Sequence, residues 1–166
     1  IYDEDTPFEP VPGKQSRVAI DRTIRDASRR GVRSIVVCPT MIYGNGLGLA
    51  RDSAQIPGLA RRAKATGVVR HVGKGLNIWS NVHVEDMAEL YSLALAKAPA
   101  GAFYFVENGE ASYRDICASI ARRLGLAAPQ VWPFAEAVEE LGASSAAYTF
   151  GSNSRVRGRR ARAELG

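Results

Sequence analysis

Three polar side chains that could do chemistry lie close together near the middle of the chain. Asn81, His83 and Asp86 follow a short apolar run and precede a helical pattern, so we expect them at a junction between a strand and a helix. Polar side chains at such a junction either cap the helix or face a cleft, where an imidazole can act as a base. Because valine flanks His83 on both sides, a packing role is the more common outcome, and Asp86 could serve only the helix dipole.

The end of the sequence is rich in arginine. Residues 151–166 contribute +4 of the formal net charge of +5, through five arginines against one glutamate: Arg155, Arg157, Arg159, Arg160, Arg162 and Glu164. Such a run can track phosphates, but no aromatic side chain alternates with these arginines to stack bases. We therefore expect a solvated helix face. Contact of one or two arginines with an anionic ligand is the first alternative, and an arginine-tail nucleic-acid binder is the least favoured one.

Other reactive groups are sparse. His71 and His83 are twelve residues apart and far from Cys38 and Cys117, so we expect no metal site. Two isolated cysteines do not make a disulfide framework, which indicates a reducing, cytoplasmic location. No run of eighteen apolar residues is present, so a soluble protein without a membrane partner is expected. The absence of an initiator methionine before Ile1 predicts that the chain is a fragment.

The elements that position these groups follow from hydrophobic periodicity. The chain has 166 residues, of which 46% are apolar, which is enough for one compact unit with a core. Periodicity and glycine or proline boundaries predict helices over residues 14–30, 57–66, 85–97, 113–124, 134–141 and 159–165, and strands over 34–38, 68–72, 78–82 and 102–106. This alternation predicts an α/β fold with a parallel sheet.

Two segments carry a family resemblance. Residues 38–44, Cys-Pro-Thr-Met-Ile-Tyr-Gly, are similar to the Arg-Pro-x-x-(Val/Ile)-Tyr-Gly segment of extended short-chain dehydrogenases/reductases of the NAD-dependent epimerase/dehydratase kind. Residues 82–88, Val-His-Val-Glu-Asp-Met-Ala, resemble the (Val/Ile)-His-Val-x-Asp-(Leu/Met/Val)-Ala segment of the same family. The resemblance implies the C-terminal part of an NAD(P)-binding Rossmann fold, with a late helix and the last two parallel strands, joined to a small α/β substrate domain.

The resemblance also implies a division of the chain and an activity. Late Rossmann elements would occupy residues 1–44 and 84–107, and the substrate-binding subdomain residues 45–83 and 108–166. The parent would bind NAD or NADP and act as an oxidoreductase, epimerase or dehydratase on a small hydroxylated or keto substrate, sugars included, with a homodimer as a compatible state. The fragment alone is expected to be inactive, because the first βαβ unit supplies the pyrophosphate site.

The cofactor contacts implied by the resemblance lie just after the first strand. Family members place this segment at the nicotinamide, which assigns Pro39, Thr40, Met41 and Ile42 to the cofactor through backbone groups. The following glycines, within residues 44–48, do not complete a dinucleotide fingerprint, because Leu49 stands where its last glycine belongs. We expect a turn there.

The usual acid–base pair of the family is missing. Alignment of the first helix puts Gly13 and Arg17 where the family has the tyrosine and lysine of its Tyr-x-x-x-Lys pair. Arg17 can still donate hydrogen bonds to a cofactor ribose, but a guanidinium cannot replace a phenol that moves a proton. No catalytic residue is therefore assigned, and a non-catalytic dinucleotide sensor is the alternative to an enzyme.

The substrate contacts implied by the resemblance are Tyr43, Trp79, Asn81, His83 and Arg155. Sugar-nucleotide epimerases commonly have an arginine that grips the diphosphate at the position of Trp79, so this chain departs from a nucleotide-sugar site. Trp79 favours an apolar or aromatic substrate face. Arg155 is the remaining candidate for contact with an anion.

Overall fold

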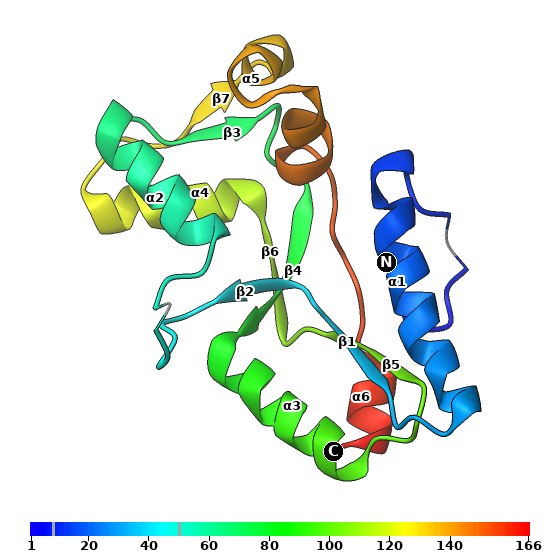
Figure 1. Ribbon diagram of the computed structural model, residues 1–166. Helices are drawn as coiled ribbons and strands as arrows, with labels where there is room; N and C mark the ends of the chain where they lie inside the picture. Colours follow the sequence, from blue (N-terminus) through cyan, green and yellow to red (C-terminus); the bar gives the residue numbers. More distant parts are fainter. Residues whose placement is uncertain (8, 50) are drawn as a thin grey trace.

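The computed structural model describes residues 1–7, 9–49 and 51–166, which form three small sheets with helices around them (Figure 1). The first sheet pairs β1 with β5, the second has the order β2-β4-β6, and the third pairs β3 with β7. In chain order the elements are η1 (Pro12–Lys14), α1 (Gln15–Asp26), η2 (Ala27–Arg30), β1 (Ile35–Pro39), β2 (Met41–Tyr43), α2 (Gln55–Thr66), β3 (Arg70–Val72), β4 (Ile78–His83), α3 (Val84–Lys97), β5 (Ala102–Val106), β6 (Gly109–Ser112), α4 (Tyr113–Leu124), β7 (Gln130–Trp132), α5 (Phe134–Leu141), η3 (Ser145–Phe150) and α6 (Arg159–Glu164).

The first sheet is parallel and is covered by different helices on its two faces. Side chains alternate along β1 and β5, so Val37 and Tyr104 pack with residues of α3 and α6. Phe103 and Cys38 point the other way, toward α1, where the guanidinium of Arg25 lies 5.6 Å from the centre of the Phe103 ring. This two-sided cover accounts for the continuous apolar character of both strands.

The second sheet joins the first to the rest of the chain. β2 follows β1 directly and pairs in parallel with β4, and β4 pairs antiparallel with β6. The sequence pattern predicted neither β2 nor β6. β2 has only three residues and β6 contains Gly109 and Glu110, so neither presents the apolar run from which a strand is inferred.

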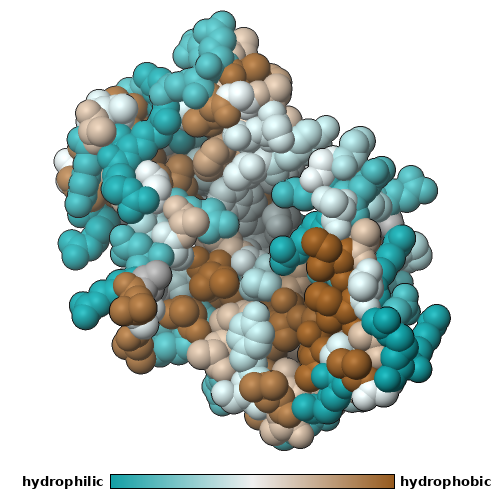
Figure 2. Space-filling model, in the orientation of Figure 1, coloured by the Kyte–Doolittle hydropathy of each residue, from teal (hydrophilic) through white to brown (hydrophobic). Residues whose placement is uncertain are grey.

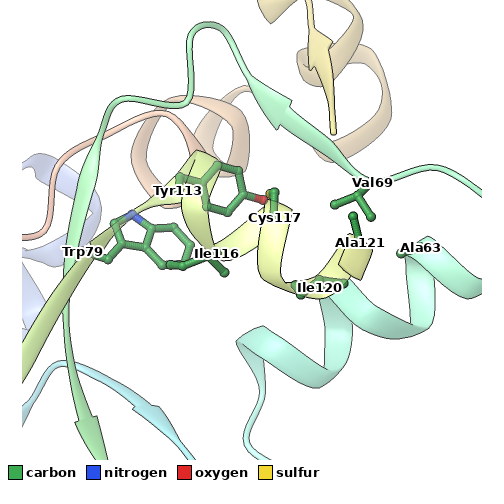
Figure 3. Close-up of a cluster of buried hydrophobic side chains, with 8 residues drawn as sticks. All are labelled: Ala63, Val69, Trp79, Tyr113, Ile116, Cys117, Ile120 and Ala121. Atoms are coloured by element: carbon green, nitrogen blue, oxygen red, sulfur yellow. The ribbon is translucent and has the colours of Figure 1, made fainter. Parts of the chain in front are cut away.

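Beyond the second sheet, α2, α4 and the β3–β7 pair enclose the main aromatic and aliphatic core of this part of the chain. Trp79 from β4 and Tyr113 from α4 meet there, with ring centres 5.0 Å apart (Figure 3). The apolar stripe of α4 continues the cluster toward α2, through Ile116 and Ile120. Ser112 caps α4, because its hydroxyl accepts a hydrogen bond from the backbone N–H of Asp115 at 3.1 Å.

Most elements expected from periodicity are confirmed. β5 and α5 have the predicted limits, and the helix expected over residues 14–30 is confirmed as α1 extended by the short helix η2. Gly31 ends it in the left-handed conformation, with a φ of 81°. β7, which has only three residues, and η3, a π-helix, were missed. The proposed division of the chain into two subdomains stays a prediction.

The arginine-rich end is tied to the chain by ion pairs and is not only a solvated helix face, which corrects that expectation. Each of its arginines has a carboxylate partner: Arg155 and Arg157 with Glu110, Arg159 with Asp3, Arg160 with Asp5, and Arg162 with Glu107. These carboxylates lie in the N-terminal segment, directly after β5 and in β6, so the ion pairs attach the C-terminal end of the chain to the N-terminal segment and to the first and second sheets. Nucleic-acid binding by this segment stays the least favoured alternative.

The outer edge of β1 is open. Within the described residues β1 pairs only with β5, whereas the far edge of β5 is covered by Glu4, whose carboxylate accepts a hydrogen bond from the backbone N–H of Phe105 at 3.1 Å. Figure 2 shows an area of hydrophobic residues over β1, between α1 and α3. Across the described ranges, no helix has the length and apolar character needed to span a membrane.

Candidate functional site

The carboxyl ends of the two strands of the first sheet meet at Thr40. The backbone N–H and the hydroxyl of Thr40 both donate to the carbonyl oxygen of Val106, at 3.1 and 2.9 Å. These bonds fix the turn that leads from β1 into β2. Ligands of open parallel sheets bind beyond the carboxyl ends of the strands, so this corner is the first place to look for a site.

A cavity of about 450 Å³ opens beside this corner, and we call it the strand-end cavity. Pro39, Thr40 and Ile42 form one wall, so three of the four residues assigned to the nicotinamide lie together. The remaining lining is mostly from the segment after β2: Gly44, Gly46, Arg51, Asp52, Ser53, Ala54, Gln55 and Val84. The polar residues of this segment were not singled out from the sequence, because no spacing marked them.

A second cavity, of about 520 Å³, lies between the second sheet and helices α2 and α4, and we call it the α4 groove. Met41, Tyr43 and Asn81 line it, so Met41 is separated from the other cofactor candidates and joins two of the substrate candidates. The reason is the alternation of side chains along β2, which sends Met41 and Tyr43 to one face and Ile42 to the other. Ile42 instead packs with the buried residues Val82 and Met87.

The contacts of His83 cap a helix and pack against neighbouring residues. Its Nδ1 accepts a hydrogen bond from the backbone N–H of Glu85 at 3.3 Å and so caps α3. Its ring stands edge-on to Tyr43, with centres 5.3 Å apart, and a Cβ at Gly44 would collide with its Nε2. Capping and packing therefore account for His83, and substrate contact by it stays a prediction.

Asp86 also has a local partner. Its carboxylate accepts a hydrogen bond from the side-chain amide of Asn108, which lies after β5. Asp86 therefore links the first turn of α3 to the carboxyl end of the first sheet.

Arg17 lies away from the strand-end cavity. Its side chain is 77% exposed and is 3.9 Å from the carboxylate of Asp21. It lines a third cavity, of about 640 Å³, between α1, the N-terminal segment and the first sheet. Cys38 lines the same cavity, where burial, together with the nearby charge of Asp21, raises the pKa of its thiol. Contact between Arg17 and a cofactor ribose stays a prediction.

Trp79 and Arg155 are engaged within the chain. Trp79 is only 5% exposed, and its indole N–H donates to the carbonyl oxygen of Ser152 at 3.2 Å. Arg155 binds Glu110 through Nε at 3.1 Å and Nη2 at 2.7 Å. The hydrogen bonds from Arg155, together with one from Arg157, lower the pKa of Glu110. Substrate contacts by Trp79 and Arg155 thus remain predictions, while their structural contacts are evident.

The α4 groove was not visible in the sequence. Ile116, Ile120 and Leu124 belong to the helix expected over residues 113–124, where an apolar stripe is typical of core, and the structure shows that they also line a cavity. Only the spacing of the polar residues beside that stripe, Ser119 and Arg123, could have indicated an open edge. Within the described part of the chain, no group of three or more His, Cys, Asp or Glu side chains is arranged to hold a metal ion.

Comparison with known proteins identifies a family and several relatives of similar sequence. A family model described as the NAD-dependent epimerase/dehydratase family matches residues 2–106. An uncharacterized protein of Schizosaccharomyces pombe is 36% identical over 124 residues, which cover 74% of this chain and 39% of that protein. The 2-alkyl-3-oxoalkanoate reductase of Stenotrophomonas maltophilia is 31% identical over 114 residues, which cover 66% of this chain and 32% of the reductase.

The fold is shared with solved structures. The dTDP-glucose 4,6-dehydratase DesIV of Streptomyces venezuelae, solved with NAD bound, matches 99% of this chain with a TM-score of 0.73 and 22% identity, over 48% of the dehydratase. The predicted fold class, an α/β part of an NAD(P)-binding Rossmann fold, is confirmed. The chain therefore spans about half or less of the length of these proteins.

Proposed function

This chain belongs to the NAD-dependent epimerase/dehydratase family, and we propose that it provides the C-terminal half of an NAD(P)-dependent reductase, epimerase or dehydratase. The observation that carries the proposal is the open outer edge of β1 with hydrophobic residues over it (Figure 2). Parallel sheets are normally covered on both faces, and an uncovered strand edge presents unpaired N–H and C=O groups that native proteins usually protect. Further parallel strands of the same Rossmann sheet would pair with this edge.

The strand-end cavity is the proposed place for the nicotinamide end of the cofactor. The donors of Thr40 are already bound to Val106, so Pro39 and Ile42 would hold the flat ring by apolar contact, and not through the amide of Thr40. The bound cofactor would supply hydride transfer. The chain itself would orient the ring and exclude water from one of its faces, and Arg17 would contribute to the ribose only if its side chain leaves Asp21.

The substrate is proposed to be a small molecule with a hydroxyl or keto group, whose reacting carbon would meet the nicotinamide while the rest of the molecule is held at the second sheet. Tyr43 and Asn81 line the α4 groove, and both present polar groups beside apolar walls. The similarity to a 2-alkyl-3-oxoalkanoate reductase supports a keto substrate over a nucleotide sugar. The protein is also proposed to be cytoplasmic and to form a homodimer.

A test of the cofactor site is to fill the strand-end cavity. Ser53 lines the cavity, whereas Leu47, in the same connecting segment, is 93% exposed and does not. In a form of the protein extended upstream through a βαβ unit, Ser53→Trp should weaken NADH or NADPH binding at least tenfold by calorimetry. Leu47→Trp is the matched control and should leave it unchanged. Equal binding by the two variants would remove the cofactor from this cavity.

A non-catalytic dinucleotide sensor is the second candidate, favoured by Gly13 and Arg17 at the positions of the usual tyrosine and lysine. Turnover of any keto or hydroxy substrate by the extended form would decide for an enzyme. Tight dinucleotide binding without turnover over a broad substrate panel would decide for the sensor.

A further inference from the structure

The α4 groove is walled mainly by hydrophobic side chains. Met41 and Ile56 line it from β2 and α2, and Ile116, Ile120 and Leu124 follow one face of α4. Ile116 and Leu124 are two helical turns apart, or about 12 Å along the axis, so this wall is elongated. The volume of about 520 Å³ lies within the range of small-molecule sites.

Polar side chains line the rim of the groove at four-residue intervals along α4: Asp115, Ser119 and Arg123. Asp115 is already occupied, since it accepts a hydrogen bond from the hydroxyl of Ser112 at 2.6 Å. Arg123, two turns further on, has no carboxylate within ion-pair distance among the described residues. The groove therefore combines a long apolar wall with one available cation at its rim.

We propose that the α4 groove binds an unbranched alkyl chain of the substrate, with a carboxylate or other monoanionic end paired to Arg123. The inference rests on the proposed function, because the substrate candidates Tyr43 and Asn81 line this groove. Burial of methylene groups along α4 supplies the affinity, and the guanidinium fixes the direction of the chain. A diphosphate is a poorer occupant, because Arg123 is the single cationic side chain among the described residues that line the groove.

Two variants of α4 make a matched pair for the test. Ser119 lines the groove, and its hydroxyl accepts a hydrogen bond from Nη2 of Arg122 at 3.0 Å. Arg122 is exposed and does not line the groove. Ser119→Phe and Arg122→Phe therefore remove the same hydrogen bond and add the same side chain, but only the first fills the groove. Circular dichroism and thermal unfolding establish that both variants fold.

The measurement is calorimetric titration of sodium hexanoate, octanoate and decanoate into the 166-residue chain. Affinity should rise with chain length, fall at least tenfold in Ser119→Phe and stay unchanged in Arg122→Phe. Arg123→Gln should weaken decanoate more than 1-decanol. Equal affinity in both phenylalanine variants, or no binding by the unmodified chain, would overturn the proposal.

A second copy of the chain is the competing occupant of the groove. If sedimentation shows a dimer that Ser119→Phe dissociates and decanoate does not bind, the groove is a protein interface and the alkyl site is wrong. No dinucleotide is present in these titrations. If no fatty acid binds, the proposed cofactor site is therefore unaffected. If the dinucleotide test fails, binding of the alkyl chain can still be measured separately.

Discussion

The ion pair between Glu107 and Arg162 should be a main attachment of the C-terminal helix to the first sheet. Glu107 follows β5 and its side chain is only 6% exposed, while that of Arg162 is 57% exposed. Oε1 of Glu107 accepts hydrogen bonds from Nη1 of Arg162 at 2.8 Å and from the backbone N–H of Gly158 at 3.2 Å. Nη2 of Arg162 also donates to the carbonyl oxygen of Glu107 at 2.7 Å. These contacts join the segment before α6 to the carboxyl end of β5.

The substitution Glu107→Gln keeps the shape and an acceptor oxygen but removes the charge. A charge-assisted hydrogen bond contributes about 1.5–3 kcal/mol and a neutral one about 0.5–1.5, so the expected loss is about 1–2 kcal/mol. Because Arg162 is more than half exposed, water can solvate its guanidinium, which keeps the loss from being larger. For a chain of this size the melting temperature should fall by about 3–6 °C.

The assay is urea unfolding followed by circular dichroism, with Arg162→Gln and the double variant completing a cycle. The coupling free energy between the two side chains should be about 1 kcal/mol. Glu107→Ala should cost about 2–3 kcal/mol, because it also leaves the N–H of Gly158 without its acceptor. An unchanged free energy of unfolding in Glu107→Gln would show that this ion pair does not stabilise the attachment of α6.

Further predictions concern thiols, acid stability and the glycine after β2. Burial raises the pKa of Cys117 to about 12 and also raises that of Cys38. Neither thiol should therefore react quickly with a disulfide reagent at about pH 8 until urea unfolds the chain. Rapid reaction in the folded state would contradict this. The pKa of Glu110 is lowered by its two arginines, so its contribution to stability is present above its ordinary pKa and is lost as pH falls through the folded value. Glu110→Gln should therefore be less stable than the unmodified chain near neutral pH and should lose less stability on acidification, as measured by urea unfolding at several pH values. Gly44 has a φ of 101° and lies against His83, so Gly44→Ala should cost at least about 1–2 kcal/mol in a thermal unfolding experiment, and an unchanged melting temperature would show that this turn is not constrained.

Local sequence patterns were sufficient for the longer elements. β5 and α5 were predicted with their observed limits, because β5 is a short apolar run and α5 is an amphipathic segment between Pro133 and Gly142. β2 could not be predicted, since its three residues form a strand only by pairing with β4. Its existence depends on a contact about forty residues away in the chain, which no local periodicity records.

The candidate site shows the same limit. Pro39, Thr40 and Ile42 were expected to lie together, and they line one cavity. That the side chain of Met41 lies on the opposite face of β2 could be inferred only once residues 41–43 were known to form a strand. The bond between Arg155 and Glu110 joins residues 45 positions apart, so the sequence could show a free arginine where the structure has an ion pair. Long-range pairing, and not residue type, decided these outcomes.

We propose that this chain is the C-terminal half of a dinucleotide-dependent protein. The most direct test of this proposal is a parallel calorimetric titration of NADH and NADPH into the 166-residue chain and into the form extended upstream through a βαβ unit. The extended form should bind one of the two dinucleotides with micromolar affinity, and the chain alone should bind it at least a hundredfold more weakly. Failure of the extended form to bind either dinucleotide, or equal binding by both forms, would contradict the proposal.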